Sequence, residues 1–316
     1  MKQILRLIIL IFFFFTGCGQ QEKGKKIIIF HAGSLSVPFK QLASEYEKRY
    51  PDIKILLEPA GSLVCARKIT ELHKPCDIMA SADYFVINEL LMPEYADWSI
   101  RFATNEIVLA YLDKSKHAGE VNSENWCDII SSEDVIYSRA DPNADPCGYR
   151  SVLALKLAEK YYSKNGLVDK LLEKDKNFIR PKEVDLIALL ESNAVDYIFN
   201  YKSVAMQHNL NYVKLPDEIN LSRPDYNDLY NTVNLEITGN TADSKMQVTG
   251  EYINYSLTVL KNSVNKADAN NFVEFLLSPE GMEIFGKSGQ DPIVPYSTEQ
   301  PGLIPSKLVK YLKSQN

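Results

Sequence analysis

Short apolar runs alternate with stretches of helical spacing along the first part of the chain. Residues 26–30 form a continuous run rich in β-branched side chains, which is typical of a buried parallel strand. The next stretch places apolar residues on one helical face: Phe39, Leu42, Ala43, Tyr46 and Tyr50. Residues 53–57 and 77–81 are two further strand-like runs, with a helical stretch from Val64 between them. Repeated at this interval, the pattern predicts parallel α/β units with right-handed crossovers.

A second α/β series follows a longer strand-like run at residues 105–112. It comprises strands at residues 135–138 and 195–199 and helices that start at Tyr149 and Val184. Another strand is predicted at residues 255–260, followed by a helix at 267–277 that the sequence Ser-Pro-Glu-Gly should end. We expect the run at 105–112 to leave a first domain and the run at 255–260 to return to it.

This arrangement predicts an α/β clam shell of two lobes joined by two crossing hinge strands. The predicted boundaries place residues 26–104 and 258–316 in lobe 1 and residues 105–257 in lobe 2. The chain length also favours two domains. No internal repeat of solenoid length is visible.

The first residues carry the features of an export signal. Lys2 and Arg6 precede an apolar run at residues 7–15, which is too short for a membrane span of ~20 residues. The Cys in Thr-Gly-Cys18 resembles a bacterial lipobox, so we expect a signal peptide at 1–17, a lipid on Cys18 and a polar tether at 18–25. An ordinary signal peptide with an incidental Cys is the alternative. Both interpretations predict an exported protein, and the lipobox interpretation also predicts a lipid anchor to the membrane.

Composition narrows the class of protein further. The net charge is −6, from 35 basic and 41 acidic residues, and no basic stripe is present, which argues against a nucleic-acid partner.

The other cysteines are Cys65, Cys76, Cys127 and Cys147, an even number that in an exported protein invites disulfides. Pairing of sequence neighbours gives Cys65–Cys76 and Cys127–Cys147, although other pairings are possible. A zinc site is less favoured, because there is no Cys-x-x-Cys and the histidines are scattered.

Two loops of the first domain pair a glycine with a serine directly before a predicted helix. Gly33-Ser34 follows the first strand and Gly61-Ser62 follows the second. Ligands of open α/β sheets bind at the carboxyl ends of strands, beside helix N-termini. Glycine permits close approach of the backbone, and serine adds a hydroxyl donor beside the helix dipole. Each serine alone could be an ordinary helix cap. Two such loops on adjacent strands favour an anion-binding cradle.

The second domain offers three candidate side chains at element ends. Asp145 lies in the run Asp-Pro-Cys-Gly-Tyr-Arg, whose turn chemistry predicts a helix start. Glu183, in Arg-Pro-Lys-Glu, begins the next helix, and Tyr201 follows the strand at 195–199. A carboxylate in a first helical turn is stabilised by the dipole, and a single Tyr more often packs. Helix-end electrostatics therefore remains open as an explanation for both carboxylates.

Together these segments resemble the tungstate- and molybdate-binding proteins of ABC transporters. The similarity runs from about residue 26 to 300. Its most specific parts are the runs at 145–150 and 180–183; it also includes His-Ala-Gly-Ser-Leu at 31–35, Gly61-Ser62 with Arg-Lys-Ile at 67–69, Ala-Ser-Ala-Asp-Tyr at 80–84 and the segment at 196–205. The resemblance implies a type II periplasmic-binding-protein-like fold, a membrane permease as partner, no cofactor, and a monomer.

The resemblance also implies a role for each site residue. The Gly33 loop, the Ser34 and Ser62 hydroxyls, the Cys147 backbone N–H and the Tyr201 hydroxyl are implied to bind the oxyanion. Asp145 and Glu183 are implied to approach the metal centre itself.

Two carboxylates beside a dianion need a physical explanation, because each contact at ~4 Å costs about 4 kcal/mol at an effective dielectric of 20. Hexavalent molybdenum or tungsten is a hard centre that can add two oxygen ligands to its four oxo groups. Sulfur and phosphorus are too small to do so. A binder of sulfate, thiosulfate or phosphate with the same fold is the main alternative. A ferric-ion binder is less favoured, because no adjacent Tyr pair lies at a predicted strand end of the second domain and Tyr161-Tyr162 falls in a predicted helix. An enzyme using Asp145, Glu183 and Tyr201 as acid, base and hydroxyl is also less favoured, because no known catalytic motif is present.

Overall fold

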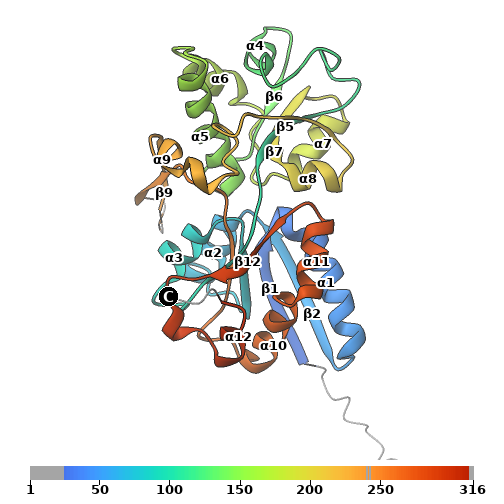
Figure 1. Ribbon diagram of the computed structural model, residues 1–316, viewed down its shortest axis with the longest axis vertical. Helices are drawn as coiled ribbons and strands as arrows, with labels where there is room; N and C mark the ends of the chain where they lie inside the picture. The colour runs from blue at the N-terminus through green and yellow to red at the C-terminus, as the bar shows by residue number, and fades with distance from the viewer. Residues whose placement is uncertain (1–24, 240, 242, 313–316) are drawn as a thin grey trace, which may run out of the picture.

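Two separate sheets form the centres of two lobes, one above the other in Figure 1. The computed structural model describes residues 25–239, 241 and 243–312. The predicted signal peptide, Cys18 and the tether up to residue 24 lie outside the described residues. The two-lobed α/β architecture predicted from the apolar pattern is confirmed. No helix in the described part of the chain is long and apolar enough to cross a membrane.

Lobe 1 contains a six-stranded sheet in the order β12-β4-β11-β3-β1-β2. Its strands are β1 (Lys25–Ala32), β2 (Ile53–Ala60), β3 (Ile78–Ser81), β4 (Ile100–Thr104), β11 (Tyr255–Val259) and β12 (Asp291–Ser297). β1 runs parallel to β2 and β3, whereas β11 is antiparallel to β3 and β4. The helices are α1 (Ser36–Arg49), α2 (Ser62–Thr70), α3 (Tyr84–Leu91), α10 (Lys266–Leu276), α11 (Pro279–Lys287) and α12 (Ser306–Val309). Figure 1 shows α1 and α11 on one side of the sheet and α2 and α3 on the other.

Lobe 2 is built on a four-stranded sheet in the order β6-β7-β5-β8. Its strands are β5 (Ile107–Tyr111), β6 (Tyr137–Ser138), β7 (Tyr197–Tyr201) and β8 (Asn211–Lys214). The helices are α4 (Trp126–Ser131), α5 (Pro146–Tyr161), α6 (Leu167–Asp175), α7 (Asp185–Glu191), α8 (Lys202–Gln207) and α9 (Asn227–Tyr230). An antiparallel hairpin of β9 (Asn234–Thr238) and β10 (Lys245–Thr249) completes the lobe. Short 3₁₀ turns occur at Gly33–Leu35, Pro224–Tyr226 and Pro301–Leu303.

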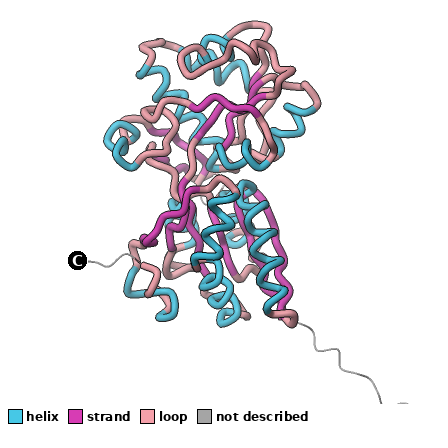
Figure 2. The backbone as a smooth tube through the Cα atoms, turned by 45° about the vertical axis from the view of Figure 1, so that its right-hand side comes forward, coloured by secondary structure: helices cyan, strands magenta, loops and turns pink. Residues whose placement is uncertain are grey.

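The chain passes between the two sheets at residues 105–106 and again at 250–254, near the waist visible in Figure 2. Asn105 fastens the first passage, because its side-chain amide donates to the Ser203 hydroxyl at 2.8 Å and to the Tyr255 hydroxyl at 3.1 Å. Tyr255 begins β11 and Ser203 lies in α8. Both lobes therefore meet through buried polar contacts at the waist.

Local structure follows the apolar pattern where the pattern is strong. The predicted inner face of α1 is buried at Phe39, Leu42, Ala43 and Tyr46, whereas Tyr50, predicted on the same face, follows the end of the helix and is exposed. The predicted helix at 267–277 ends before the Ser-Pro-Glu-Gly sequence as expected, since α10 ends at Leu276, but Ser278 also caps a further helix, α11, which was not predicted. The Ser278 hydroxyl accepts from the Gly281 N–H at 3.3 Å, a standard N-cap contact.

The prediction of disulfides is wrong. Cys65, Cys76, Cys127 and Cys147 are all free thiols and all buried. The Cys65 thiol donates to the His31 carbonyl at 3.6 Å, while the Cys76 thiol donates to the Ile78 carbonyl at 3.1 Å. Each cysteine behaves as a small, buried apolar residue. Burial raises the pKa of the Cys65 and Cys127 thiols to about 12, which suppresses the reactive thiolate.

Candidate functional site

The predicted site residues come from both lobes and meet between them. Ser34 lies in the 3₁₀ turn after β1, and Ser62 is the first residue of α2 after β2. On the lobe 2 side, Glu183 lies just before α7 and approaches the first loop directly. A Cβ atom added to Gly33 would lie 2.9 Å from both Glu183 carboxyl oxygens. Likewise, a Cβ added to Gly61 would lie 2.3 Å from the Ala144 carbonyl oxygen. Glycine at both positions permits this close approach of the lobes.

The loops that carry the two carboxylates are fastened side by side. A parallel bridge joins Ala140 to Arg180, and the Asp141 N–H donates to the Arg180 carbonyl at 2.7 Å. Asp145 is the N-cap of α5: one carboxyl oxygen accepts from the Cys147 N–H at 2.7 Å. Its other oxygen accepts from the Glu183 N–H at 3.3 Å. The chain therefore brings Asp145 and Glu183 together from positions 38 residues apart in sequence.

Glu183 is buried without a partner. Its side chain is 1% exposed, and neither carboxyl oxygen has a hydrogen-bond partner among the described residues. Burial, followed by the neighbouring charge of Glu183, raises the pKa of Asp145 well above its usual range. An unpaired buried carboxylate is costly. The pair therefore suits a ligand that supplies an electron-poor centre.

Three hydroxyls of the predicted site each accept a hydrogen bond from the protein. The Ser34 hydroxyl accepts from the Tyr255 hydroxyl at 2.9 Å, and the Ser62 hydroxyl accepts from the Ala82 N–H at 3.0 Å. The Tyr201 hydroxyl, at the end of β7, accepts from the Arg150 guanidinium at 3.1 Å. A hydroxyl that accepts from the protein keeps its own hydrogen to donate to a ligand. Burial raises the pKa of Tyr201 well above its usual range, so its phenol stays protonated.

The remaining predicted donor, the Cys147 N–H, is directed to the Asp145 carboxylate. Its contact with a bound oxyanion stays a prediction, in which the N–H is shared between the Asp145 oxygen and the ligand. No group of three or more potential His, Cys, Asp or Glu ligands for a metal cation occurs within the described ranges. Asp145 and Glu183 are therefore not part of a larger cluster of such ligands among these residues.

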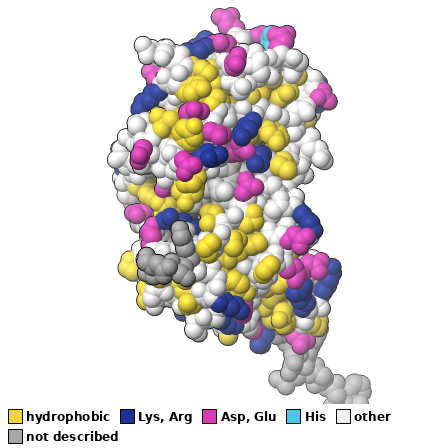
Figure 3. Space-filling model, viewed as in Figure 1, with side chains coloured by type: hydrophobic (Ala, Val, Ile, Leu, Met, Phe, Trp, Pro, Cys, Tyr) yellow, Lys and Arg dark blue, Asp and Glu magenta, His cyan; other side chains and the backbone are white. Residues whose placement is uncertain are grey.

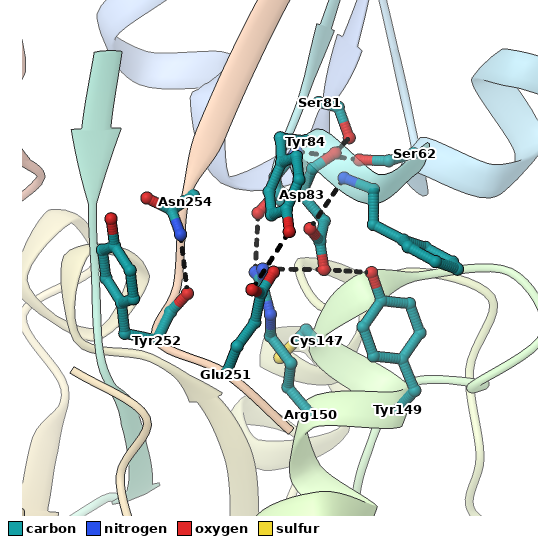
Figure 4. A network of polar contacts seen from close by, with 12 residues as sticks. Ser62, Ser81, Asp83, Tyr84, Cys147, Tyr149, Arg150, Glu251, Tyr252 and Asn254 are labelled. Atoms are coloured by element: carbon teal, nitrogen blue, oxygen red, sulfur yellow. Dashed lines mark hydrogen bonds and ion pairs between the residues drawn. The ribbon is translucent and has the colours of Figure 1, made fainter. Parts of the chain in front are cut away.

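Sequence reasoning missed a polar network that joins the lobes beside these residues (Figure 4). The Arg150 guanidinium, 2% exposed, forms an ion pair with Asp83 at 2.8 Å and donates to the Ala82 carbonyl at 2.6 Å. The Tyr149 hydroxyl donates to the same Asp83 carboxylate at 2.6 Å. Asp83 also caps α3 through the Phe85 N–H. The runs at 80–84 and 145–150 contained these residues, but only the placement of the lobes gives them a shared role.

Comparison with known proteins places the chain in a family. Residues 27–290 match the model of the bacterial extracellular solute-binding proteins. A solute-binding protein of Petrotoga mobilis is 43% identical over 99% of this chain and 98% of its own. The molybdate/tungstate-binding protein WtpA of Pyrococcus abyssi is 45% identical over 90% of this chain and 91% of its own.

The fold has a solved counterpart in the periplasmic molybdate-binding protein of Azotobacter vinelandii. That structure covers 84% of this chain and 98% of its own, with a TM-score of 0.62 and 16% identity. The resemblance to tungstate- and molybdate-binding proteins, first apparent in short sequence runs, is confirmed by the Pyrococcus abyssi relative, which aligns with 90% of this chain. The chain belongs to the bacterial extracellular solute-binding protein family.

Proposed function

We propose that this protein captures tungstate or molybdate between its lobes and delivers it to an ABC permease. The observation that carries the proposal is the buried Glu183 carboxylate, unpartnered and beside Asp145. A buried carboxylate without partners, next to a second carboxylate, disfavours every ordinary anion. The two carboxylates become favourable only when the central atom of the anion accepts their oxygens as ligands.

The donors around this pair suit the oxo groups of such an anion. Ser34 and Ser62 contribute hydroxyls from lobe 1, and Tyr201 contributes one from lobe 2. Four oxo groups and two carboxylate oxygens complete a six-coordinate centre. The name of the Pyrococcus abyssi relative agrees with this ligand.

Sulfate, thiosulfate and phosphate remain the alternative ligands of the same fold. They could use the hydroxyls, but they give Asp145 and Glu183 no function, because sulfur and phosphorus do not add oxygen ligands here. At ~4 Å and an effective dielectric of 20, each carboxylate would cost about 4 kcal/mol. Ferric ion is disfavoured for a separate reason. Phenolate is its usual tyrosine ligand, whereas burial raises the pKa of Tyr201.

The test is calorimetry and thermal melting of the mature protein with tungstate, molybdate, sulfate, phosphate and ferric citrate. Ligand at a thousandfold above its dissociation constant stabilises the folded state by about 4 kcal/mol. We expect this stabilisation with tungstate or molybdate and none with sulfate or phosphate. The double variant Asp145→Ala/Glu183→Ala should lose tungstate binding. Equal binding of sulfate by the wild type, or unchanged tungstate affinity in the double variant, would contradict the proposal.

We further propose that a lipid on Cys18 anchors the mature protein to the outside of a membrane, with the tether holding it near the permease. The support is the basic and apolar start of the sequence followed by Thr-Gly-Cys. Expressed in a bacterial host, the wild type should partition into detergent, and Cys18→Ser should partition into the aqueous phase. Equal partitioning of the two proteins would overturn the anchor.

A further inference from the structure

A continuous chain of hydrogen bonds connects a ligand-binding hydroxyl of one lobe to that of the other. It begins at Ser62, whose hydroxyl accepts from the Ala82 N–H at 3.0 Å. The carbonyl of the same residue, Ala82, accepts from the Arg150 guanidinium at 2.6 Å. The same guanidinium nitrogen of Arg150 then donates to the Tyr201 hydroxyl at 3.1 Å. The Arg150 side chain therefore links a donor group of one lobe to a donor group of the other.

We propose that Arg150 is a positioning residue: it fixes the Tyr201 hydroxyl as a donor toward the bound oxyanion and ties that donor to the closed arrangement of the lobes. The inference deepens the proposed function and depends on it. It assigns Arg150 no contact with the oxyanion. Its effect reaches the ligand through Tyr201.

The chemistry of the guanidinium sets the direction of the hydrogen bond. Arginine has five N–H donors, no acceptor, and keeps its charge in proteins, so it can only donate to the phenol oxygen. Among the described residues, the Tyr201 hydroxyl has no acceptor for its own hydrogen. That hydrogen is thus available to an oxo group, and a donated hydrogen bond from a cation polarises the O–H further.

Asp83 makes the position of the Arg150 guanidinium depend on closure of the two lobes. Its carboxylate, from lobe 1, pairs with Arg150 at 2.8 Å and accepts from the Tyr149 hydroxyl at 2.6 Å. Both members of the ion pair are almost fully buried, at 2% and 3% exposure. A buried ion pair is sensitive to geometry, because either charge left alone is strongly destabilising. Separation of the lobes would remove Asp83 and the Ala82 carbonyl from Arg150 and release the restraint on Tyr201.

A second arginine provides a matched comparison. Arg67, in α2 of lobe 1, also reaches across to lobe 2, where it donates to the Asn143 carbonyl at 2.7 Å and the Thr238 carbonyl at 2.9 Å. None of its hydrogen bonds involves Tyr201 or Ser62. Arg67 therefore contributes to closure alone, whereas Arg150 contributes to closure and to the Tyr201 donor.

The test is a pair of double-variant cycles on tungstate affinity, measured by calorimetry on the mature protein. Arg150→Gln and Tyr201→Phe should each weaken binding at least about tenfold, the size of a hydrogen bond to a charged group. Their combination should bind about as weakly as the weaker single variant, since both remove the same donor. In the second cycle, the losses of affinity caused by Arg67→Gln and Tyr201→Phe should instead multiply in the double variant. Multiplicative losses in the Arg150 cycle would overturn the inference.

Further measurements separate folding failure from loss of positioning. Each variant is melted without ligand, and its radius of gyration is measured with and without tungstate by X-ray scattering. If Arg150→Gln fails to fold, Asp83→Asn replaces it, because Asn can still cap α3 while presenting an N–H to Arg150 instead of an acceptor. Asp83→Asn should weaken tungstate binding at least about tenfold, and unchanged affinity would overturn the inference. Absence of tungstate binding by the wild type would overturn the proposed function instead.

Discussion

Glu183→Gln should move stability and ligand affinity in opposite directions. Glutamine has nearly the same shape as glutamate but carries no charge. In the structure both Glu183 carboxyl oxygens are buried without hydrogen-bond partners, next to Asp145. The substitution removes the repulsion between the two carboxyl groups and offers an amide N–H to Asp145. We therefore expect the closed, unliganded protein to become more stable by about 1–3 kcal/mol, the usual value of a relieved buried polar group.

The same substitution should weaken tungstate binding strongly. An amide oxygen is a poorer ligand for a hard centre than a carboxylate. Removal of one member of a buried charged contact costs about 2–5 kcal/mol, which corresponds to roughly 30- to 5,000-fold in the dissociation constant. Calorimetry gives the affinity. Melting and X-ray scattering of the ligand-free protein give stability and closure, with a higher melting temperature and a smaller radius of gyration expected for the variant.

Glu191→Gln is the matched control, because Glu191 is exposed at the end of α7, a short distance along the chain from Glu183. Glu191→Gln should change neither the tungstate affinity nor the stability of the ligand-free protein. Tungstate affinity within about threefold of wild type in Glu183→Gln would refute coordination by this carboxylate. A ligand-free Glu183→Gln protein that melts lower or opens wider would refute the reasoning from an uncompensated buried charge.

Two other changes test closure and pH dependence. Gly61 has an ordinary backbone conformation (φ −59°), but a Cβ at this position would meet the Ala144 carbonyl. Gly61→Ala should therefore block closure and weaken tungstate binding about 5- to 150-fold, which corresponds to an overpacking cost of about 1–3 kcal/mol. Gly119→Ala is the control and should leave binding unchanged, because a Cβ on Gly119 would lie in open space. Affinity equal to wild type in Gly61→Ala would show that the lobes close differently. Burial lowers the pKa of His31 from 6.5 to about 4, so the unfolded chain takes up a proton on this residue first. The free energy of unfolding should therefore fall by about 3 kcal/mol on account of His31 as the pH drops from 6.5 to 4. Urea titrations over this pH range should show the decrease in the wild type and lack it in His31→Gln. An equal decrease in both proteins would contradict the assignment to His31.

Local sequence pattern was sufficient for the elements that carry the site. The β-branched run of β1 and the apolar face of α1 obey strand and helix periodicity, and both form as expected. Asp145 could be placed at a helix start because Asp-Pro-Cys-Gly predicts a turn, and the structure has it as the N-cap of α5. These features depend on residues only a few positions apart, which is why sequence alone reveals them.

Other elements escaped prediction because nothing local specifies them. β12 contains Pro292 and Pro295, is largely exposed, and pairs with β4 only near its ends, so it shows neither an apolar run nor alternation. The Asp83–Arg150 contact joins residues from different lobes, and its formation depends on how the lobes close. The disulfide prediction failed for a related reason, since cysteine count says nothing about which element each thiol is packed into.

On the face drawn in Figure 3, Lys and Arg side chains are interspersed with Asp and Glu, so this face offers a dianion no continuous region of positive charge. In the proposed function, Asp145 and Glu183 would select the anion where the lobes meet, and their burial would link this selection to lobe closure. In an open arrangement, water can solvate Asp145 and Glu183. Closure without ligand buries both and leaves the Glu183 oxygens without partners, so the empty closed form is disfavoured. A ligand shifts the equilibrium only by its difference in affinity for the two forms. If the protein binds tungstate as we propose, sulfate would leave the Glu183 carboxylate without a partner, whereas tungstate would remove the penalty by coordination. In the proposed function, the same two residues would exclude the common anions and would keep an empty protein from presenting the closed form to a permease.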